Sequence, residues 1–118
     1  MENILIVDDE EHILDLYQKE LMEEGYGVKL ARNSTQALEI AEREKINLVV
    51  LDIKLSGDDS GLQTLSLLKK QNKDLPVILN SAYSTYKNNF QTWLADAYLV
   101  KSSNLEEIKE KIRVLLRG

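Results

Sequence analysis

The sequence predicts an α/β fold, in which helices cover both faces of a parallel five-stranded sheet in a doubly wound (βα)5 arrangement. The stretches 3–9 (NILIVDD) and 46–54 (INLVVLDIK) are apolar runs of the kind that strands buried on both faces require. Segments with apolar residues at helical spacing alternate with such strands along the chain. Because every connection is short, we expect parallel strands joined by right-handed crossovers.

Five strands are expected. The first and third are the two apolar runs, and the second is a short strand in which Val28 and Leu30 alternate with a lysine. Pro76 precedes the fourth strand at 77–80, and the fifth strand covers 97–100. In the strand order 2-1-3-4-5 the winding reverses between the first and third strands, so a ligand is expected beyond the carboxyl ends of those two.

The first two helices have clear ends in the sequence. Residues 10–24 carry apolar side chains at positions 13, 16, 17 and 21, and this pattern stops at Gly25. Asn33 is placed to cap a second helix over 34–45, with Gln36 completing a capping box.

The remaining helices differ in strength. After a turn at 57–60, Ser60 can cap a third helix, whose inward residues are Leu62, Leu65 and Leu68. Residues 84–94 repeat large apolar side chains every four positions, but their Ser, Thr and Asn content gives a low helix propensity. The last helix has Asn104 as its cap and Glu107 to close a capping box. Its inward residues are Leu105, Ile108, Ile112 and Leu115.

Composition excludes several functional classes. At 118 residues with 43% hydrophobic content, the chain is expected to form one domain, 1–118, with a sizeable core. It has no cysteine, which excludes disulfides, a thiolate nucleophile and a cysteine zinc site. No basic and apolar leader precedes the first strand, and no apolar run approaches the roughly 20 residues that span a bilayer. A cytoplasmic location without membrane contact is therefore expected, and the net charge of -5 argues against nucleic-acid binding.

Three carboxylates follow the two central strands. Asp8 and Asp9 come after the first strand and Asp52 after the third, so parallel pairing would bring them to one edge of the sheet. Two carboxylates about 5 Å apart repel by about 3 kcal/mol at an effective dielectric near 20, so a cation is expected among them. All-oxygen ligation with few protein groups suits Mg²⁺, which commonly shares its coordination shell with a phosphate.

Two further polar residues end later strands. Ser81 follows the fourth strand with a hydroxyl, and Lys101 follows the fifth with a long cation. Together with the acids and a divalent metal, they supply what phosphoryl transfer to a carboxylate requires. Each residue alone also has a structural explanation: the first acids as helix caps, Ser81 as a turn former, Lys101 as a solvated lysine. The functional interpretation depends on all of them falling at the carboxyl ends of strands in one sheet.

The motifs ILIVDDE, LVVLDIK, PVILNSAY and DAYLVKS, in this order and spacing, resemble the receiver domain of two-component response regulators over the whole chain. The resemblance implies the flavodoxin-like receiver fold. It also implies a phosphoacceptor signalling switch of a two-component system or phosphorelay, which modifies itself and is not a turnover enzyme. Asp52 would take a phosphoryl group from a sensor histidine kinase or a histidine phosphotransfer protein. The output surface would comprise segment 84–94, the fifth strand and the last helix, in a monomer or a phosphorylation-dependent dimer.

The resemblance also implies a ligand set for the metal. Asp9 would bind Mg²⁺ directly and Asp8 through water. Asp52 and the backbone carbonyl of Lys54 would complete the protein ligands.

Three further positions take roles from the resemblance. Lys101 would pair with the acidic site and then with the phosphoryl group, Ser81 would hydrogen-bond that group, and Tyr98 would be the aromatic switch. The family commonly has a proline after the lysine, where this chain has Ser102. Because a non-proline cis bond costs about 3 kcal/mol, we expect a trans Lys101–Ser102 peptide.

Two hypotheses concern residues beside the site. Lys54 and Tyr83 lie two residues after Asp52 and Ser81, where bulky side chains would limit in-line attack by water and lengthen the lifetime of the aspartyl phosphate. Leu14 lies off the predicted inward stripe of the first helix and is a candidate kinase contact.

Other protein classes share parts of this residue set. A phosphatase of the haloacid dehalogenase type places a second aspartate two residues after its nucleophile, where this chain has Lys54. A flavodoxin-like FMN carrier needs a hydroxyl- and glycine-rich loop after the first strand, whereas residues 8–11 are four acids that would repel a phosphate. A receiver that serves only for docking would lack acceptor residues, and this chain has every one of them.

Overall fold

Five parallel strands form one sheet in the order β2-β1-β3-β4-β5, as the sequence predicts. The computed structural model describes residues 1–54, 61–82, 94–102 and 104–117. The strands are β1 (Asn3–Val7), β2 (Gly27–Ala31), β3 (Leu48–Leu51), β4 (Val77–Ser81) and β5 (Ala97–Val100). The helices are α1 (Glu11–Glu23), α2 (Ser34–Arg43), α3 (Gly61–Gln71) and α4 (Glu106–Arg117). Of the helix predicted at 84–94, residues 84–93 lie outside the described residues.

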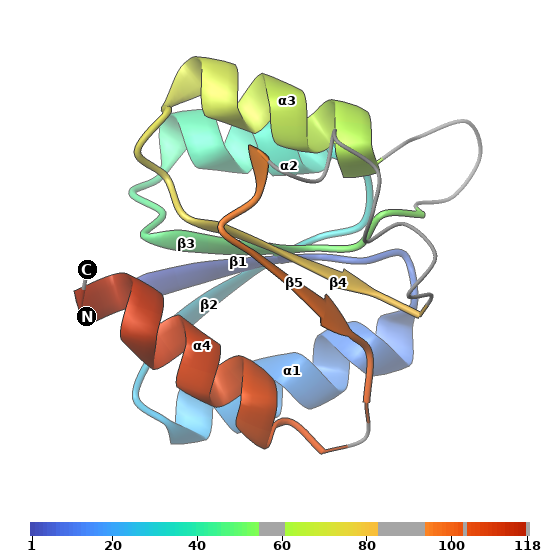
Figure 1. Cartoon of the computed structure of the whole chain (residues 1–118), viewed down its shortest axis with the longest axis vertical. Helices are drawn as coiled ribbons and strands as arrows, with labels where there is room; N and C mark the ends of the chain where they lie inside the picture. Colours follow the sequence, from blue (N-terminus) through green and yellow to red (C-terminus); the bar gives the residue numbers. More distant parts are fainter. Residues whose placement is uncertain (55–60, 83–93, 103, 118) are drawn as a thin grey trace.

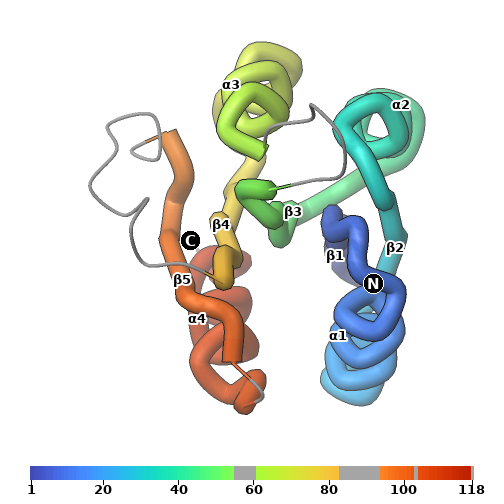
Figure 2. Tube along the Cα trace, turned by 90° about the vertical axis from the view of Figure 1, so that its right-hand side faces the viewer, coloured from blue at the N-terminus to red at the C-terminus, as the bar shows by residue number. Residues whose placement is uncertain are grey.

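The sheet is the middle of three layers. Figure 1 shows α2 and α3 on one face of the sheet and α1 and α4 on the other, and Figure 2 shows the same layers from the side. Side chains alternate between the faces along each strand, so each face has its own apolar core. The core under α2 and α3 includes Leu5, Val7, Val49, Leu51, Leu65 and Leu68. The core under α1 and α4 includes Ile4, Ile6, Val50, Ile78, Leu99 and Ile112.

Local signals place the helix ends. Gly25 has a φ of 96°, and the N–H groups of Gly25 and Tyr26 close the last turn of α1 onto its carbonyls at 3.0 and 3.2 Å. Asn33 caps α2, because its Oδ1 accepts the N–H of Gln36 at 2.9 Å. The side chain of Gln36 accepts the N–H of Arg32 at 2.8 Å, one residue before the cap, so the predicted capping box is shifted by one position.

The inward stripe of α1 differs from the predicted one. Leu14 is fully buried and packs with Tyr17 and Leu21, whereas Leu16 is 39% exposed. Helical neighbours three and four residues apart share a face, so Leu14, Tyr17 and Leu21 form one stripe and Leu16 falls outside it. The assignment of Leu14 as an exposed kinase contact is therefore wrong, because its side chain is part of the core.

The start of α4 agrees with the sequence in the role of Asn104 but not in the predicted capping box, because the N–H of Asn104 donates to Ser102 Oγ at 3.1 Å and not to Glu107. Oδ1 of Asn104 accepts the N–H of Glu106 at 2.9 Å and so satisfies one free donor of the first turn. The inward face of the helix is buried at Leu105, Ile108 and Ile112, and Leu115 packs at its margin.

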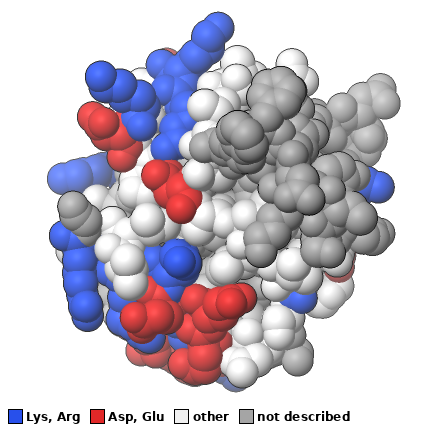
Figure 3. Space-filling model, in the orientation of Figure 1, with Lys and Arg blue, Asp and Glu red and all other residues white. Residues whose placement is uncertain are grey.

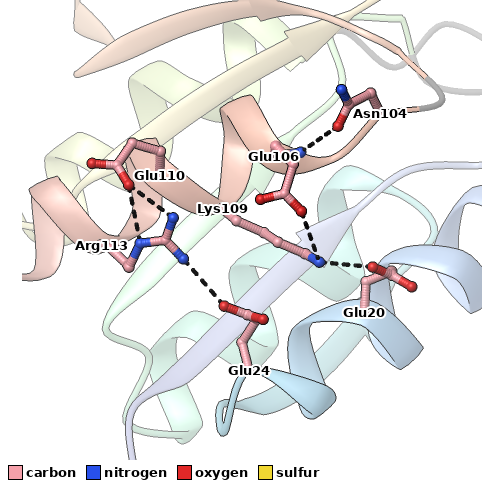
Figure 4. Close-up of polar contacts among 7 residues, drawn as sticks. All are labelled: Glu20, Glu24, Asn104, Glu106, Lys109, Glu110 and Arg113. Atoms are coloured by element: carbon pink, nitrogen blue, oxygen red, sulfur yellow. Dashed lines mark hydrogen bonds and ion pairs between the residues drawn. The ribbon is translucent and has the colours of Figure 1, made fainter.

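Ion pairs join α4 to α1 on the outer side of their contact. Lys109 Nζ lies 2.7 Å from Glu20 Oε1, and Arg113 Nη1 lies 3.1 Å from Glu24 Oε1 (Figure 4). Figure 3 shows acidic and basic side chains intermingled over this part of the surface. The two helices on this face are thus held to each other by charge as well as by the shared core.

No helix in the described part of the chain combines the length and the apolar character that crossing a bilayer would need.

Candidate acidic site

Two carboxylates are brought together by the pairing of the central strands. Val7 of β1 and Leu51 of β3 are register partners, so Asp8 and Asp52 follow them at the same carboxyl edge. Backbone hydrogen bonds hold both positions: the N–H of Asp52 donates to the carbonyl of Val7 at 3.0 Å, and the N–H of Asp8 donates to Ala31 at 3.1 Å. Both side chains are buried, with residue exposures of 2% for Asp8 and 6% for Asp52.

Lys101 joins these two carboxylates. Its Nζ lies 2.7 Å from Asp8 Oδ2 and 3.3 Å from Asp52 Oδ2, and its side chain is 13% exposed. The N–H of Lys101 donates to the carbonyl of Ser81 at 2.7 Å, which fixes the end of β5 against the end of β4. The described part of the chain has no cis peptide bond, so the expected trans Lys101–Ser102 peptide is confirmed.

Burial and the charges of the site shift the pKa values of Asp52 and Lys101. Burial raises the pKa of Asp52 to about 6, Lys101 opposes this rise, and the charge of Asp8 adds to it. Burial alone would lower the pKa of Lys101, but its hydrogen bond to Asp8 and the charges of both carboxylates raise it. Asp52 is therefore mostly ionised near neutral pH, in a site with more negative than positive charge.

Three acids that are consecutive in the sequence lie close together at the end of β1. Carboxylate oxygens of Asp8, Asp9 and Glu10 lie within 4.8 Å of one another, with Asp8 buried and the other two exposed. Asp52 is connected to this group through Lys101. Oδ1 of Asp8 accepts the N–H of Glu10 at 2.9 Å and so stabilises the turn into α1. The N-cap residue is Glu10 and no side chain caps this helix, so the explanation of the first acids as helix caps is wrong. A cluster of carboxylate oxygens fits a hard divalent cation such as Mg²⁺.

A pocket of about 230 Å³ opens over the acids. Its lining combines carboxylates, a hydroxyl and ammonium groups, and consists of Asp9, Glu10, Asp52, Lys54, Ser81, Ala82 and Lys101. Ser81 is buried at its floor with an exposure of 1%, and Lys54 is exposed at its rim. Glu10 was absent from the predicted site, although the run of four acids at 8–11 contained the signal.

Other predicted positions lie farther from the acids or outside the described residues. Tyr98 is partly buried and packs against the core under α2 and α3. Tyr83, predicted beside the pocket, lies outside the described residues.

Gly61 is a residue of the site that the sequence reasoning missed. It begins α3, and its N–H donates to the carbonyl of Ile53 at 2.6 Å. A Cβ at this position would collide with the backbone carbonyl of Asp52. The glycine thus allows the first turn of α3 to pack directly on the backbone of Asp52, a contact that no local sequence pattern indicates.

Comparisons with known proteins agree with one another. A family model described as the response regulator receiver domain matches residues 4–113. The transcriptional regulatory protein YkoG of Bacillus subtilis is 40% identical over 118 residues, which cover 98% of this chain and 51% of YkoG. The crystal structure of the response regulator TrrA from Thermotoga maritima in complex with Mg²⁺-BeF is 43% identical, has a TM-score of 0.93 and covers 98% and 99% of the two chains.

Two further structures are similar. The complex of TrrA with the histidine kinase ThkA matches at 44% identity and a TM-score of 0.91, over 98% of this chain and 99% of the other. A response regulator from Burkholderia pseudomallei with a phosphorylated aspartic acid and a calcium ion matches at 28% identity and a TM-score of 0.83, over 97% and 72% of the two chains. The chain spans 20% and 51% of the length of two curated relatives that it matches.

Proposed function

The chain belongs to the response regulator receiver domain family, and on this basis we propose that Asp52 accepts a phosphoryl group in a two-component signalling system. One observation carries the assignment of the site: Lys101 bridges Asp8 and Asp52 at 2.7 and 3.3 Å beneath a pocket lined by Ser81. Phosphoryl transfer to a carboxylate needs a nucleophile together with cations and donors for the phosphoryl oxygens.

The proposed metal is Mg²⁺. Asp9 is exposed to the pocket and suited to direct ligation, whereas Asp8 is buried behind it and suited to ligation through water. Asp52 and the backbone carbonyl of Lys54 complete the proposed set, and Glu10 adds a carboxylate close to Asp8 and Asp9. When bound, the ion would offset the charge of the acids and of the incoming phosphoryl oxygens.

The proposed reaction follows from the charges. A carboxylate oxygen of Asp52 forms a bond to phosphorus while the P–N bond of a phosphohistidine breaks, and the electron pair returns to the imidazole. Because the pKa of Asp52 is about 6, its carboxylate is mostly ionised at neutral pH and can act as the nucleophile. The amine of Lys101 and the hydroxyl of Ser81 would then contact the transferred group.

The response to phosphorylation is proposed to travel through Ser81 and Tyr98. Ser81 ends β4, and Tyr98 of β5 is the register partner of Leu79, two residues before Ser81. A shift of Ser81 toward the phosphoryl group would therefore act close to the packing of Tyr98, and change the surface of segment 84–94, β5 and α4. Lys54 and Tyr83 are proposed to slow hydrolysis by limiting access of water.

The proposed partner is a sensor histidine kinase or a histidine phosphotransfer protein. The kinase complex of TrrA, at 44% identity, supports a kinase partner. We further propose that residues 1–118 form one receiver domain, which acts in the cytoplasm without binding nucleic acid or membrane, as a monomer or a phosphorylation-dependent dimer. It would modify itself without turnover of a free substrate.

Intact mass spectrometry tests the proposal. The protein is incubated with Mg²⁺ and acetyl phosphate, and one phosphoryl group should add about 80 Da. Asp52→Asn and an EDTA-treated sample are the controls, and neither should gain the mass. No adduct on the unmodified chain, or an equal adduct on Asp52→Asn, would contradict the proposal.

A second measurement addresses the rate of hydrolysis. The phosphorylated protein is separated from acetyl phosphate, and loss of the adduct is followed over time. Lys54→Ala combined with Tyr83→Ala should shorten the lifetime of the adduct. An unchanged lifetime would contradict the proposed role of these two side chains.

A further inference from the structure

The buried polar pair Tyr17 and Asn80 has no role in the site described so far. Asn80 Nδ2 donates to the hydroxyl of Tyr17 at 2.8 Å, and the two residues are only 4% and 2% exposed. Tyr17 lies on α1, and Asn80 is the residue of β4 directly before Ser81. The bond therefore joins the helix that follows the acidic cluster to the strand that carries the hydroxyl of the pocket.

The strand register places Asn80 in one row with the two buried acids. Val7, Leu51 and Leu79 are register partners across β1, β3 and β4, and the next residue of each strand is Asp8, Asp52 and Asn80. By strand alternation, all three side chains belong to the sheet face that α1 and α4 cover. A polar side chain in this row costs free energy unless it is paired, and an apolar residue would pack there without a partner.

Lys101 reaches the acids from the far side of this row. It follows β5 two residues after Leu99, the register partner of Asn80. Because the strand order is β1-β3-β4-β5, a side chain at the end of β5 has to cross β4 to reach Asp52 and Asp8. The residue of β4 in that row and on that face is Asn80.

Two further observations connect the pair to the segment around Lys101. The lining of a small cavity of about 10 Å³ includes Tyr17 and Asn80 as well as Val100 and Ser102, the two neighbours of Lys101. Burial raises the pKa of the Tyr17 hydroxyl, Asn80 opposes this through its hydrogen bond, and the charge of Lys101 also acts on it. The pair thus lies within electrostatic range of the lysine and lines a cavity together with the two neighbours of this residue.

We propose that the Tyr17–Asn80 hydrogen bond positions Lys101. By holding the Asn80 amide against α1, it sets the path of the lysine side chain over β4 and keeps the amine between Asp8 and Asp52. Tyr17 and Asn80 are positioning residues, since they act on the phosphoryl group only through Lys101. The phosphorylation part of this inference depends on the proposed function, whereas the effect on metal binding does not.

The test uses Tyr17→Phe in the full chain, which removes only the hydroxyl. Magnesium affinity is measured by titration calorimetry without a phosphodonor, and phosphorylation by acetyl phosphate is timed by intact mass. A less constrained lysine competes less for Asp8, so Mg²⁺ should bind about threefold more tightly, while phosphorylation should slow by about threefold to tenfold. General loosening of the site would instead weaken both. Tyr26→Phe, the same change at a partly buried residue at the opposite edge of the sheet, should alter neither.

A double-mutant cycle shows whether the effect passes through the lysine. Lys101→Met should produce the same two changes, and adding Tyr17→Phe to it should change neither value further. Asn80→Leu, which fills the space with an apolar side chain, should reproduce Tyr17→Phe in the otherwise unaltered chain.

The possible results are distinct. An unchanged or weakened Mg²⁺ affinity in Tyr17→Phe, or an equal effect of Tyr17→Phe with and without Lys101, would overturn the inference. If the unaltered chain takes up no phosphoryl group, the proposed function fails, and the magnesium titrations still decide whether the pair positions the lysine.

Discussion

The two edges of the sheet contain different kinds of polar interaction. At the carboxyl edge, Asp8, Asp52 and Lys101 are buried together, and two negative charges share one positive charge. The rise in the pKa of Asp52 to about 6 shows that its ionised form is disfavoured there. This edge of the molecule therefore stores unfavourable electrostatic energy in the absence of a cation.

At the amino edge, the polar groups are matched. The backbone N–H of Asn3 donates to the side chain of Asn47 at 2.8 Å, and the N–H of Asn47 donates back to the carbonyl of Asn3 at 2.8 Å. Asp96 accepts from the N–H of Val77 at 2.8 Å and from Lys69 at 2.9 Å. These contacts fix where strands begin and leave no excess charge among them.

In this fold, the chemistry depends on the carboxyl edge of the sheet, whereas the matched contacts at the amino edge contribute to stability alone. Substitutions that remove a negative charge at the carboxyl edge, such as Asp52→Asn, should stabilise the protein and abolish its chemistry. Substitutions that remove a matched contact at the amino edge should destabilise it and leave the chemistry intact.

Gly61→Ala should be an exception to this rule. It lies at the carboxyl edge but should lower both stability and the rate of phosphorylation, because the backbone is closely packed there. The added Cβ would collide with the Asp52 carbonyl, and α3 would have to move. We expect a loss of about 3 kcal/mol in the free energy of unfolding, measured in urea, together with slower phosphorylation. Gly25→Ala is the matched control: its φ of 96° is unfavourable for alanine, but no atom lies within 4 Å, so about 1 kcal/mol should be lost without any change in phosphorylation. Equal losses in the two variants would show that the contact with Asp52 is unimportant.

Asp52→Asn should stabilise the metal-free protein. Since folding raises the pKa of Asp52 from 3.8 to about 6, the folded state binds the proton more tightly, and wild-type stability falls as pH rises through this range. The variant lacks this penalty, so it should gain about 2 kcal/mol at pH 7 in EDTA. The gain should shrink as pH falls through about 6 and disappear near pH 3, where the carboxyl is mostly protonated in both states.

Urea denaturation at several pH values measures this difference. Asp15→Asn, an exposed acid on α1, is the control and should give no such pH-dependent gain. A gain of Asp52→Asn that is independent of pH would contradict the electrostatic explanation.

Asp96→Ala should have the opposite combination of effects. It leaves the buried N–H of Val77 without its acceptor and removes the partner of Lys69, so about 1 kcal/mol of stability should be lost. Phosphorylation by acetyl phosphate should be unchanged, because the residue is at the amino edge. Asp96→Asn, which keeps an acceptor oxygen, should lose less; a slower phosphorylation of either variant would contradict the separation of the two edges.

Much of the fold could be predicted because its signals are local. The apolar runs placed β1 and β3, the residues predicted for the fifth strand are those of β5, and Asn33 and Gly25 mark helix ends as expected. The acids followed from the same runs, since parallel strands of known order bring their carboxyl ends together.

The features that the sequence did not predict correctly depend on packing between distant parts of the chain. Apolar residues at 13, 14, 16 and 17 allow two inward stripes for α1, and only packing against the sheet decides in favour of Leu14. Gly61 and Asn80 have roles that depend on contacts with distant parts of the chain, namely the Asp52 backbone and Tyr17. Such contacts become visible once the register of the strands is known.

The direct contact of Gly61 with the backbone at Asp52 also has a mechanical consequence. No side chain separates the two segments, so a displacement of one cannot be absorbed by a change of rotamer. α3 is a continuous helix of 11 residues, about 16 Å long, and it runs from this contact to the opposite end of the sheet. A small movement of the main chain at residue 52 would therefore shift α3 as a rigid body. It would displace Gln71 at the far end of the helix as well as the residues beside the acids.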